Sequence, residues 1–150
     1  MLSVIQRVAT ARVEVGGEVI GAIDQGLLVL VCAQAGDTAE TADRFVHKLL
    51  RLRIFEDDAG KMNRSVQDLD GAGRLGGVLL VSQFTLAADT KSGTRPGFSG
   101  AAAPTVARAW FDGLVARMRQ AHPIVATGRF ATDMQVHLIN DGPVTIPMQL

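Results

Sequence analysis

The chain has 150 residues, of which 47% are hydrophobic, so it has the length of one domain and can bury a core. Lys and Arg equal Asp and Glu at 15 each, which argues against a strongly basic, non-specific nucleic-acid binder but allows a local basic patch. No apolar run reaches the roughly 18 residues of a membrane helix and the N-terminus lacks a signal-peptide pattern, so no membrane partner is expected. The single cysteine, Cys32, cannot form an internal disulfide and indicates the reducing cytoplasm.

Several segments show the alternation or the short apolar runs that are typical of β-strands. In chain order they are residues 1–8, 12–15, 18–21, 27–33, 78–86, 134–138 and 144–146. Gly16-Gly17 separates the second segment from the third and predicts a two-residue hairpin turn. Residues 54–63 contain a polar turn at 57–60 and predict a second, smaller hairpin.

Two helices are expected. Asp37 opens the first, with Glu40 as its capping-box partner. Pro104 suits the first turn of the second, which must end before His122-Pro123. Each has an apolar stripe at helical spacing. The stripes are Ala42, Phe45, Leu49 and Leu52 in the first helix, and Val106, Trp110, Leu114 and Met118 in the second.

The remaining segments are predicted to be loops. Residues 67–77 are rich in Gly and Asp, and residues 89–103 hold Gly, Pro, Thr and Ser without periodicity. A long ordered loop such as the second is more often functional than idle. Most of the predicted strands follow one another closely in the sequence, as the strands of hairpins do. Residues 1–150 are therefore predicted to form a single α+β domain with a mainly antiparallel sheet and two helices.

Motifs for cofactors and metals are weak. Residues 71–76 match G-x-G-x-x-G but lie in a polar loop before a strand, whereas a dinucleotide fingerprint follows a strand and opens a helix. The histidines His47, His122 and His137 are scattered and have no metal-ligand spacing. No cofactor and no metal are therefore expected. No G-x-S-x-G elbow supports a serine triad.

Two short segments carry the functional argument. Ser82-Gln83-Phe84-Thr85-Leu86 ends the most apolar strand, and period-two geometry predicts Gln83 and Thr85 on one face. Gly142-Pro143 follows a strand-like run, and an X-Pro bond can be cis at modest cost. Taken alone, the first segment is a half-buried strand end and the second a turn between strands.

Both segments resemble motifs of the D-aminoacyl-tRNA deacylases, and the resemblance covers the whole chain. The matching stretches, in order, are Ile5-Gln6-Arg7-Val8, Arg53-Ile54-Phe55, Gly60-Lys61-Met62-Asn63, Ser82 to Thr90, Arg95-Pro96, Phe98-Ser99, Thr127-Gly128-Arg129-Phe130 and Asn140 to Thr145. So many short matches in the same order are highly specific. The resemblance implies that the sheet curls into a barrel-like layer with two helices and that the protein is a homodimer.

The resemblance also implies a hydrolase that cleaves the ester between a D-amino acid and the 3′ end of tRNA. Gln83, Phe84 and Thr85 would form the catalytic floor, with Ser82 and Met134 beside the substrate. Gly142-Pro143, with a cis bond, would enter the active site of the other subunit and reject L-amino acids, and Arg7 would fix its orientation. From its sequence position alone, Arg7 would be interpreted as an exposed charge at the end of a strand.

The catalytic role of Thr85 stays open at this point. A threonine nucleophile needs an activating base, and none is visible nearby in the sequence. We therefore expect the backbone N–H groups of Phe84 and Thr85 to form an oxyanion hole, with Gln83 positioning the substrate. Water would be activated by the ribose hydroxyl of the substrate itself.

The expected role is chiral proofreading in translation, and glycyl-tRNA is expected to be a further substrate. Two other functions are an editing deacylase for a mischarged small L-amino acid and a non-catalytic nucleic-acid-binding module. The intact Gly142-Pro143 weighs against the first, and zero net charge weighs against the second, so no DNA partner is expected. Candidates for a tRNA-contacting patch are Arg7, Lys61, Lys91, Arg95 and Arg129.

Overall fold

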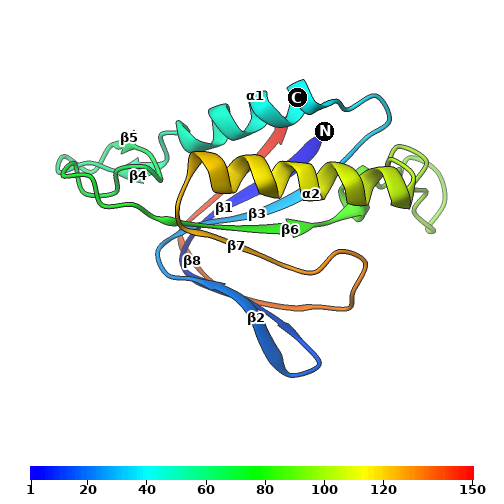
Figure 1. Cartoon of the computed structure of the whole chain (residues 1–150), viewed down its shortest axis with the longest axis horizontal. Helices are drawn as coiled ribbons and strands as arrows, with labels where there is room; N and C mark the ends of the chain where they lie inside the picture. The colour runs from blue at the N-terminus through cyan, green and yellow to red at the C-terminus, as the bar shows by residue number, and fades with distance from the viewer.

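A bent, nearly closed β-sheet and two helices make up the structure, a computed structural model that describes residues 1–150 (Figure 1). The strands are β1 (Leu2–Val15), β2 (Glu18–Ile23), β3 (Gly26–Cys32), β4 (Phe55–Glu56), β5 (Met62–Arg64), β6 (Gly77–Ser82), β7 (Val125–Thr127) and β8 (Gln135–Gln149). The helices are α1 (Ala39–Leu50), the short 3₁₀ helix η1 (Phe84–Ala87) and α2 (Pro104–Ala121). No helix combines the length and apolar character that a membrane crossing requires.

The main sheet has the strand order β2-β1-β3-β6-β7, and β8 pairs with the other edge of β1 along its bent length. β1 is antiparallel to β2, β3 and β8. β3–β6 and β6–β7 are parallel, because α1 and α2 provide the crossover connections that parallel neighbours need. The barrel-like sheet with two helices is confirmed, but the sheet is mixed rather than purely antiparallel.

The two ends of this sheet approach each other and almost close the barrel. Gly21 of β2 lies directly against β7: a Cβ atom there would be 2.5 Å from the carbonyl oxygen of Thr127. Only glycine permits this approach, since any side chain would push the strands apart. Glycine at position 21 is therefore required where β2 and β7 meet.

Apolar side chains fill two cores. The larger lies between the sheet and the helices, which pack side by side on one face of the sheet (Figure 1). It contains Phe45 and Leu49 of α1 and Leu114 and Met118 of α2, all fully buried. The smaller fills the barrel and contains Val8, Ala11, Val13, Ile23, Leu28, Leu79 and Val81. β1 serves both cores: Ile5, near its start, belongs to the larger core, and Val8, Ala11 and Val13, further along the strand, belong to the smaller one.

The helices begin and end close to the predicted positions, with three differences. Leu52 of the first predicted stripe lies beyond the end of α1. The N-cap of α1 is Thr38, and its capping box is closed by Thr41 rather than by Asp37 and Glu40. Asp37 instead accepts a hydrogen bond from the Met1 ammonium at 2.7 Å. Val106 of α2 is 57% exposed, so the predicted stripe was wrong there, and Phe111 takes the buried place.

The largest departures from the predicted strands lie around the two motifs. The predicted strand 78–86 ends at Ser82, because Gln83 begins a 3₁₀ turn in which Leu86 N–H donates to the Gln83 carbonyl at 3.2 Å. The two predicted strands at 134–138 and 144–146 are one bent strand, β8. The short β7 gave no sequence pattern and was not predicted. The hairpins at Gly16-Gly17 and at β4–β5 are confirmed.

Candidate active site

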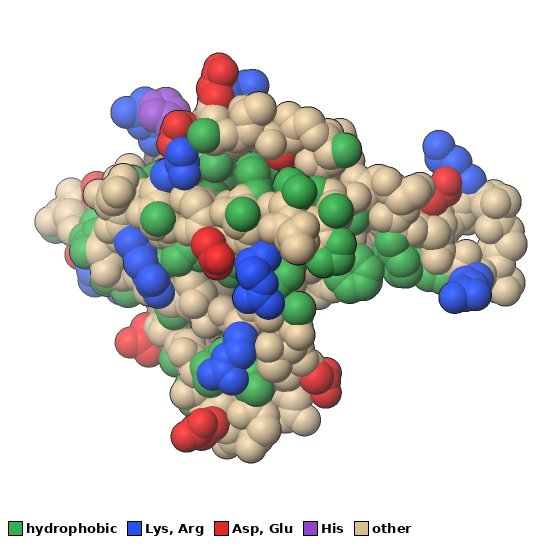
Figure 2. Space-filling view, turned by 45° about the vertical axis from the view of Figure 1, so that its right-hand side comes forward, with side chains coloured by type: hydrophobic (Ala, Val, Ile, Leu, Met, Phe, Trp, Pro, Cys, Tyr) green, Lys and Arg blue, Asp and Glu red, His purple; other side chains and the backbone are tan.

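A cavity of about 750 Å³ opens where β3 and β6 end beneath the first turns of α2. Of its 20 lining residues, 16 are hydrophobic, so it suits a ligand with substantial apolar surface. Small side chains make room along one wall: Ala101, Ala102, Ala103, Pro104 and Ala107. Figure 2 shows hydrophobic side chains gathered beside α2 and toward the protruding segment at the right.

The floor of the cavity is the predicted segment that begins at Ser82. The N–H of Gln83 donates to the carbonyl of Val31 at 2.7 Å, which ends the pairing with β3. The chain then turns into η1, which presents Phe84 outward, 54% exposed. The Phe84 ring meets the edge of Phe98 at 5.1 Å between centroids. The long loop 89–103 is therefore tied to the cavity through Phe98, which also lines it.

Gln83 and Thr85 remain neighbours although they are not on a strand. The Gln83 side-chain amide donates a hydrogen bond to the Thr85 hydroxyl. An amide cannot remove a proton, so this contact does not activate Thr85 as a nucleophile. The N–H groups of Phe84 and Thr85 open the 3₁₀ helix and have no acceptor within it, and Gln83 does not cap them. They are available for an oxygen of a bound molecule.

Cys32 at the end of β3 also lines the cavity but is poorly suited to nucleophilic chemistry. Its thiol donates to the carbonyls of Ala33 at 3.4 Å and Phe84 at 3.5 Å. Burial raises the pKa of the Cys32 thiol, so the reactive thiolate is scarce at neutral pH. Within residues 1–150 no three or more His, Cys, Asp or Glu side chains gather as metal ligands would.

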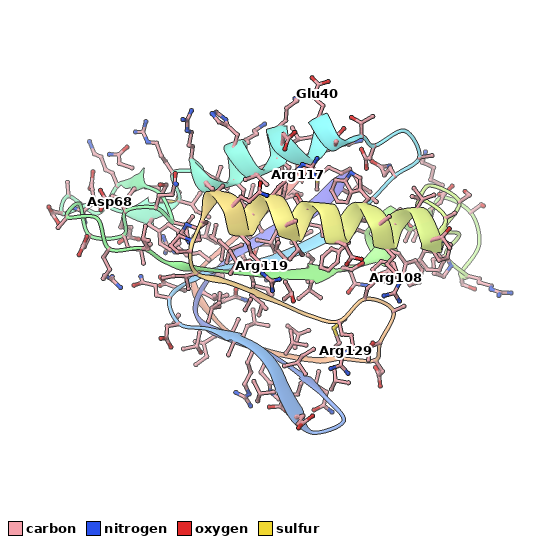
Figure 3. The ribbon with its side chains drawn as sticks, viewed as in Figure 1. Glu40, Asp68, Arg108, Arg117, Arg119 and Arg129 are labelled. Atoms are coloured by element: carbon pink, nitrogen blue, oxygen red, sulfur yellow. The ribbon has the colours of Figure 1, made fainter.

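The opposite wall comes from the segment between β7 and β8. Met134 and Phe130 line the cavity, and the Met134 sulfur accepts a hydrogen bond from the Arg129 N–H at 3.3 Å. The guanidinium of Arg108 lies 4.8 Å from the centre of the Phe130 ring. Arg108 and Arg129 are at the same end of the molecule, on α2 and on this segment (Figure 3).

Gly142-Pro143 forms an exposed bend in β8, and its peptide bond is cis. Gly142 has φ +129°, a region that side chains disfavour. A Cβ atom there would be 3.0 Å from the Val144 nitrogen and 3.1 Å from an Arg7 nitrogen. Both the backbone angle and the space therefore require glycine.

Arg7 is buried beneath this bend, 5% exposed, so it is neither an exposed strand-end charge nor a surface contact for tRNA. Its Nε donates to the Asp141 carbonyl at 2.9 Å and its Nη1 to the Ile54 carbonyl at 2.8 Å. It also lies 3.3 Å from the Asp141 carboxylate. The planar guanidinium thus joins β1, the start of β4 and the residue before Gly142.

The structure brings together only some of the predicted site residues. Ser82, Gln83, Phe84 and Met134 line the cavity, and Thr85 adjoins it. Gly142, Pro143 and Arg7 do not line it within one chain. The wall residues Ala107, Trp110 and Phe130 were not predicted as site residues, because α2 and the segment before β8 come together only in the folded chain.

Comparison with known proteins identifies the fold first. A solved structure titled "Structural Analysis of a probable eukaryotic D-amino acid tRNA deacylase" is similar, with a TM-score of 0.79 and 17% identity over 98% of this chain and 97% of that one. At such identity the likeness concerns the fold alone. Another, titled "c-Myc DNA Unwinding Element Binding Protein", has a TM-score of 0.90 and 38% identity, covering 100% of this chain and 99% of that one.

Sequence comparison then identifies the family. The family model described as D-Tyr-tRNA(Tyr) deacylase matches residues 4–149. The D-aminoacyl-tRNA deacylase of Polaromonas naphthalenivorans (strain CJ2) is 64% identical, covering 100% of this chain and 97% of its own. That of Acidovorax ebreus (strain TPSY) is 61% identical, covering 100% and 98%. The chain belongs to the D-Tyr-tRNA(Tyr) deacylase family.

Proposed function

We propose that this protein hydrolyses the ester bond of D-aminoacyl-tRNA, releasing the D-amino acid and free tRNA as chiral proofreading in translation. The observation that carries the proposal is the family match over residues 4–149, with Ser82-Gln83-Phe84-Thr85 at the floor of the cavity. The reaction takes place where aminoacyl-tRNA is used, so the protein works in the cytoplasm. No cofactor is needed, because an aminoacyl ester is already reactive toward water.

The chemistry uses backbone groups rather than a side-chain nucleophile. Water attacks the ester carbonyl, its oxygen bonds to the carbonyl carbon, and the bond to the ribose oxygen breaks. The ribose oxygen leaves with a proton, and a ribose hydroxyl of the substrate assists the attacking water. The N–H groups of Phe84 and Thr85 stabilise the negative oxygen that develops on the carbonyl. The side chain of Gln83 orients the substrate.

Thr85 and Cys32 support this mechanism because neither side chain is activated as a nucleophile. The Thr85 hydroxyl accepts a hydrogen bond from Gln83 and has no basic partner, and burial raises the pKa of the Cys32 thiol. Neither group is activated for covalent catalysis. Attack by water with oxyanion stabilisation requires neither of these groups.

Chiral selection is assigned to the backbone at Gly142-Pro143. In one chain this bend lies outside the cavity, so we propose a homodimer in which the bend of each chain enters the cavity of its partner. Three features support a partner there. β8 pairs only with β1, so one of its edges is free. Ile139, close to the bend, is 62% exposed, and Phe84 at the cavity is 54% exposed.

The bend rejects an L-amino acid by collision. If the carbonyl groups of Gly142 and Pro143 occupy the space that an L side chain needs, rejection does not depend on which side chain it is. Arg7 holds the bend in place through the Asp141 carbonyl. Ser82 and Met134 contact the substrate from the cavity wall.

The deciding experiment is a deacylation time course with D-tyrosyl-tRNA and L-tyrosyl-tRNA at one enzyme concentration. The D-substrate is expected to be hydrolysed and the L-substrate to be spared. Equal hydrolysis of both, or hydrolysis of the L-substrate alone, would overturn the proposal. The molar mass in solution tests the dimer, for which a monomer at all concentrations is the contrary result.

A further inference from the structure

The outer face of α1 carries a stripe of cationic side chains that the proposed reaction does not use. Arg44, Lys48 and Arg51 recur at i, i+4 and i+7, which places them on one side of the helix and its C-cap. All three are exposed. They line a shallow groove of about 650 Å³ together with His47 and Arg53. This set of five residues is called the α1 basic stripe below.

The Lys and Arg side chains of the α1 basic stripe have no acidic partner within the chain, although the Arg53 guanidinium donates hydrogen bonds to Asn63. Arg44, Lys48, Arg51 and Arg53 take part in none of the ion pairs of the structure. Asp43, the acidic residue in the groove, is held by Arg117 at 2.7 Å. Figure 3 shows Arg117 on α2 beside α1, and Figure 2 shows Lys and Arg side chains beside a histidine at the upper left.

Such a concentration is notable because the whole chain has a formal charge of zero. Free cations in a row along a helix attract a polyanion, and a nucleic-acid backbone is the polyanion with evenly spaced charges. The groove contains few apolar side chains, which argues against a protein partner that docks by hydrophobic contact. The chemistry of the stripe therefore fits phosphodiester groups.

The stripe also lies within reach of the cavity. Trp110 lines the cavity and donates a hydrogen bond from its ring N–H to the Thr38 carbonyl at 3.2 Å, at the N-cap of α1. With a rise of about 1.5 Å per residue, Arg44 lies about 9 Å and Arg51 about 20 Å further along the helix axis. A short unpaired nucleotide segment spans such distances before the duplex of an acceptor stem begins.

We propose that the α1 basic stripe binds the phosphate backbone of the tRNA acceptor stem while the 3′ end occupies the cavity. This inference rests on the proposed function for its choice of RNA. The contacts are to phosphates, so they position the substrate without reading its sequence. The stripe would lower the KM for full-length tRNA and leave the chemical step unchanged.

The test uses a triple variant, Arg44→Gln, Lys48→Gln and Arg51→Gln, in the full-length protein. Glutamine keeps the helix propensity, and all three positions are exposed, so the fold should persist. The matched control removes three cations elsewhere, Arg12→Gln, Arg74→Gln and Arg119→Gln, and so changes the net charge equally. A second variant, Arg44→Lys with Arg51→Lys, keeps the charge of the stripe.

Binding of tRNA without an amino acid is measured against salt concentration. For the stripe variant, the affinity at about 0.1 M salt should fall about tenfold, and the slope of log K against log salt should shrink by about 2 to 3. The control triple variant and the Arg-to-Lys variant should bind much as the unmodified protein does. Equal affinity and slope for the stripe variant and the control triple variant would overturn the inference.

Hydrolysis assays separate this inference from the proposed function. With D-aminoacyl-tRNA the stripe variant should show a raised KM and an unchanged kcat, whereas D-aminoacyl-adenosine, which has no stem, should be hydrolysed normally. If the unmodified protein hydrolyses neither substrate, the proposed function fails, while the tRNA-binding result still decides the role of the stripe. If a DNA hairpin of equal stem length binds more tightly than tRNA, the stripe serves DNA and the inference is wrong.

Discussion

The cavity at the end of β6 and the bend of β8 hold their polar groups in different ways. The cavity is lined mostly by hydrophobic side chains, and its polar floor consists of a few groups around Gln83 and Thr85. The bend is exposed, but the guanidinium of Arg7 beneath it is buried and hydrogen-bonded to two carbonyls. A cavity with room for a ligand and a backbone bend fixed from beneath therefore lie in separate parts of the chain.

This difference suggests a division of labour. An apolar cavity with small wall residues accepts many side chains, since each methylene contributes only about 1–3 kcal/mol of discrimination. In the proposed mechanism, a backbone segment fixed from below rejects an L-amino acid by shape, whatever the identity of its side chain. Variants in the two regions should therefore have different defects. Those at the bend should lose discrimination between D- and L-substrates, and those at the cavity should hydrolyse the substrate more slowly.

The largest effect is expected for Arg7→Ala. It leaves the Asp141 and Ile54 carbonyls without their donor and removes a charge from beside Asp141 and Glu56. Because those carboxylates are partly exposed and can rehydrate, the loss of unfolding free energy should be about 2 to 3 kcal/mol, below that for a fully buried pair. Denaturant unfolding of the variant and the unmodified protein measures this loss of unfolding free energy. Arg7→Lys should recover only part of the unfolding free energy that Arg7→Ala loses, because an ammonium group cannot span both carbonyls.

Gly142→Ala should weaken the distinction between D- and L-substrates at a smaller cost in stability. The new Cβ atom would press on the Val144 backbone and on Arg7, so the bend must shift. The stability loss should be about 1 to 3 kcal/mol, and hydrolysis of L-aminoacyl-tRNA should become measurable. Gly36→Ala is the matched control, since Gly36 has φ +92° with open space around it. If both variants keep full chiral discrimination, the bend is not the selector.

Thr85→Ala should change the rate much less. The hydroxyl is held by an amide donor and has no base, whereas the Thr85 N–H is kept in the variant. We expect kcat within about tenfold of the unmodified protein, because loss of a catalytic nucleophile costs several orders of magnitude. Such a loss, with folding and tRNA binding intact, would identify Thr85 as a nucleophile and contradict the backbone mechanism.

The smallest effect is expected from the thiol of Cys32. Because burial raises its pKa, the group stays protonated at neutral pH and ionises only at more alkaline pH than a free thiol. Alkylation of the folded protein should therefore be slow at pH 7 and accelerate above the ordinary thiol range, and Cys32→Ala should leave kcat within about twofold. Rapid alkylation at pH 7 that abolishes activity would indicate a functional thiolate.

The sequence predicted some of the elements around the cavity and missed others. Local patterns placed the Gly16-Gly17 hairpin, the start of α2 at Pro104 and the apolar strand leading to Ser82, because each depends on neighbouring residues. The predicted end of that strand, at Leu86, was wrong, because the strand ends at Ser82. Period-two alternation cannot reveal that Gln83 starts a 3₁₀ turn, since the turn depends on where pairing with β3 stops.

Contacts between distant segments explain the other misses. Arg7 is buried because residues 54 and 141 surround it, which no local pattern shows. The parallel pairs β3–β6 and β6–β7 arise from helical crossovers, and β7 has only three residues. The cavity wall at Ala107 and Phe130 is assembled from α2 and the segment before β8. The motif resemblance predicted several residues that line this cavity but not the side chains of its α2 wall.

The most direct test of backbone selection is a time course with D-alanyl-, L-alanyl- and glycyl-tRNA at one enzyme concentration. A bend that rejects L-substrates by collision has nothing to collide with in glycine. We therefore predict rapid hydrolysis of D-alanyl-tRNA, slower but clear hydrolysis of glycyl-tRNA, and none of L-alanyl-tRNA. If glycyl-tRNA is spared as completely as L-alanyl-tRNA, the site recognises the D side chain itself, and selection by the Gly142-Pro143 backbone is contradicted.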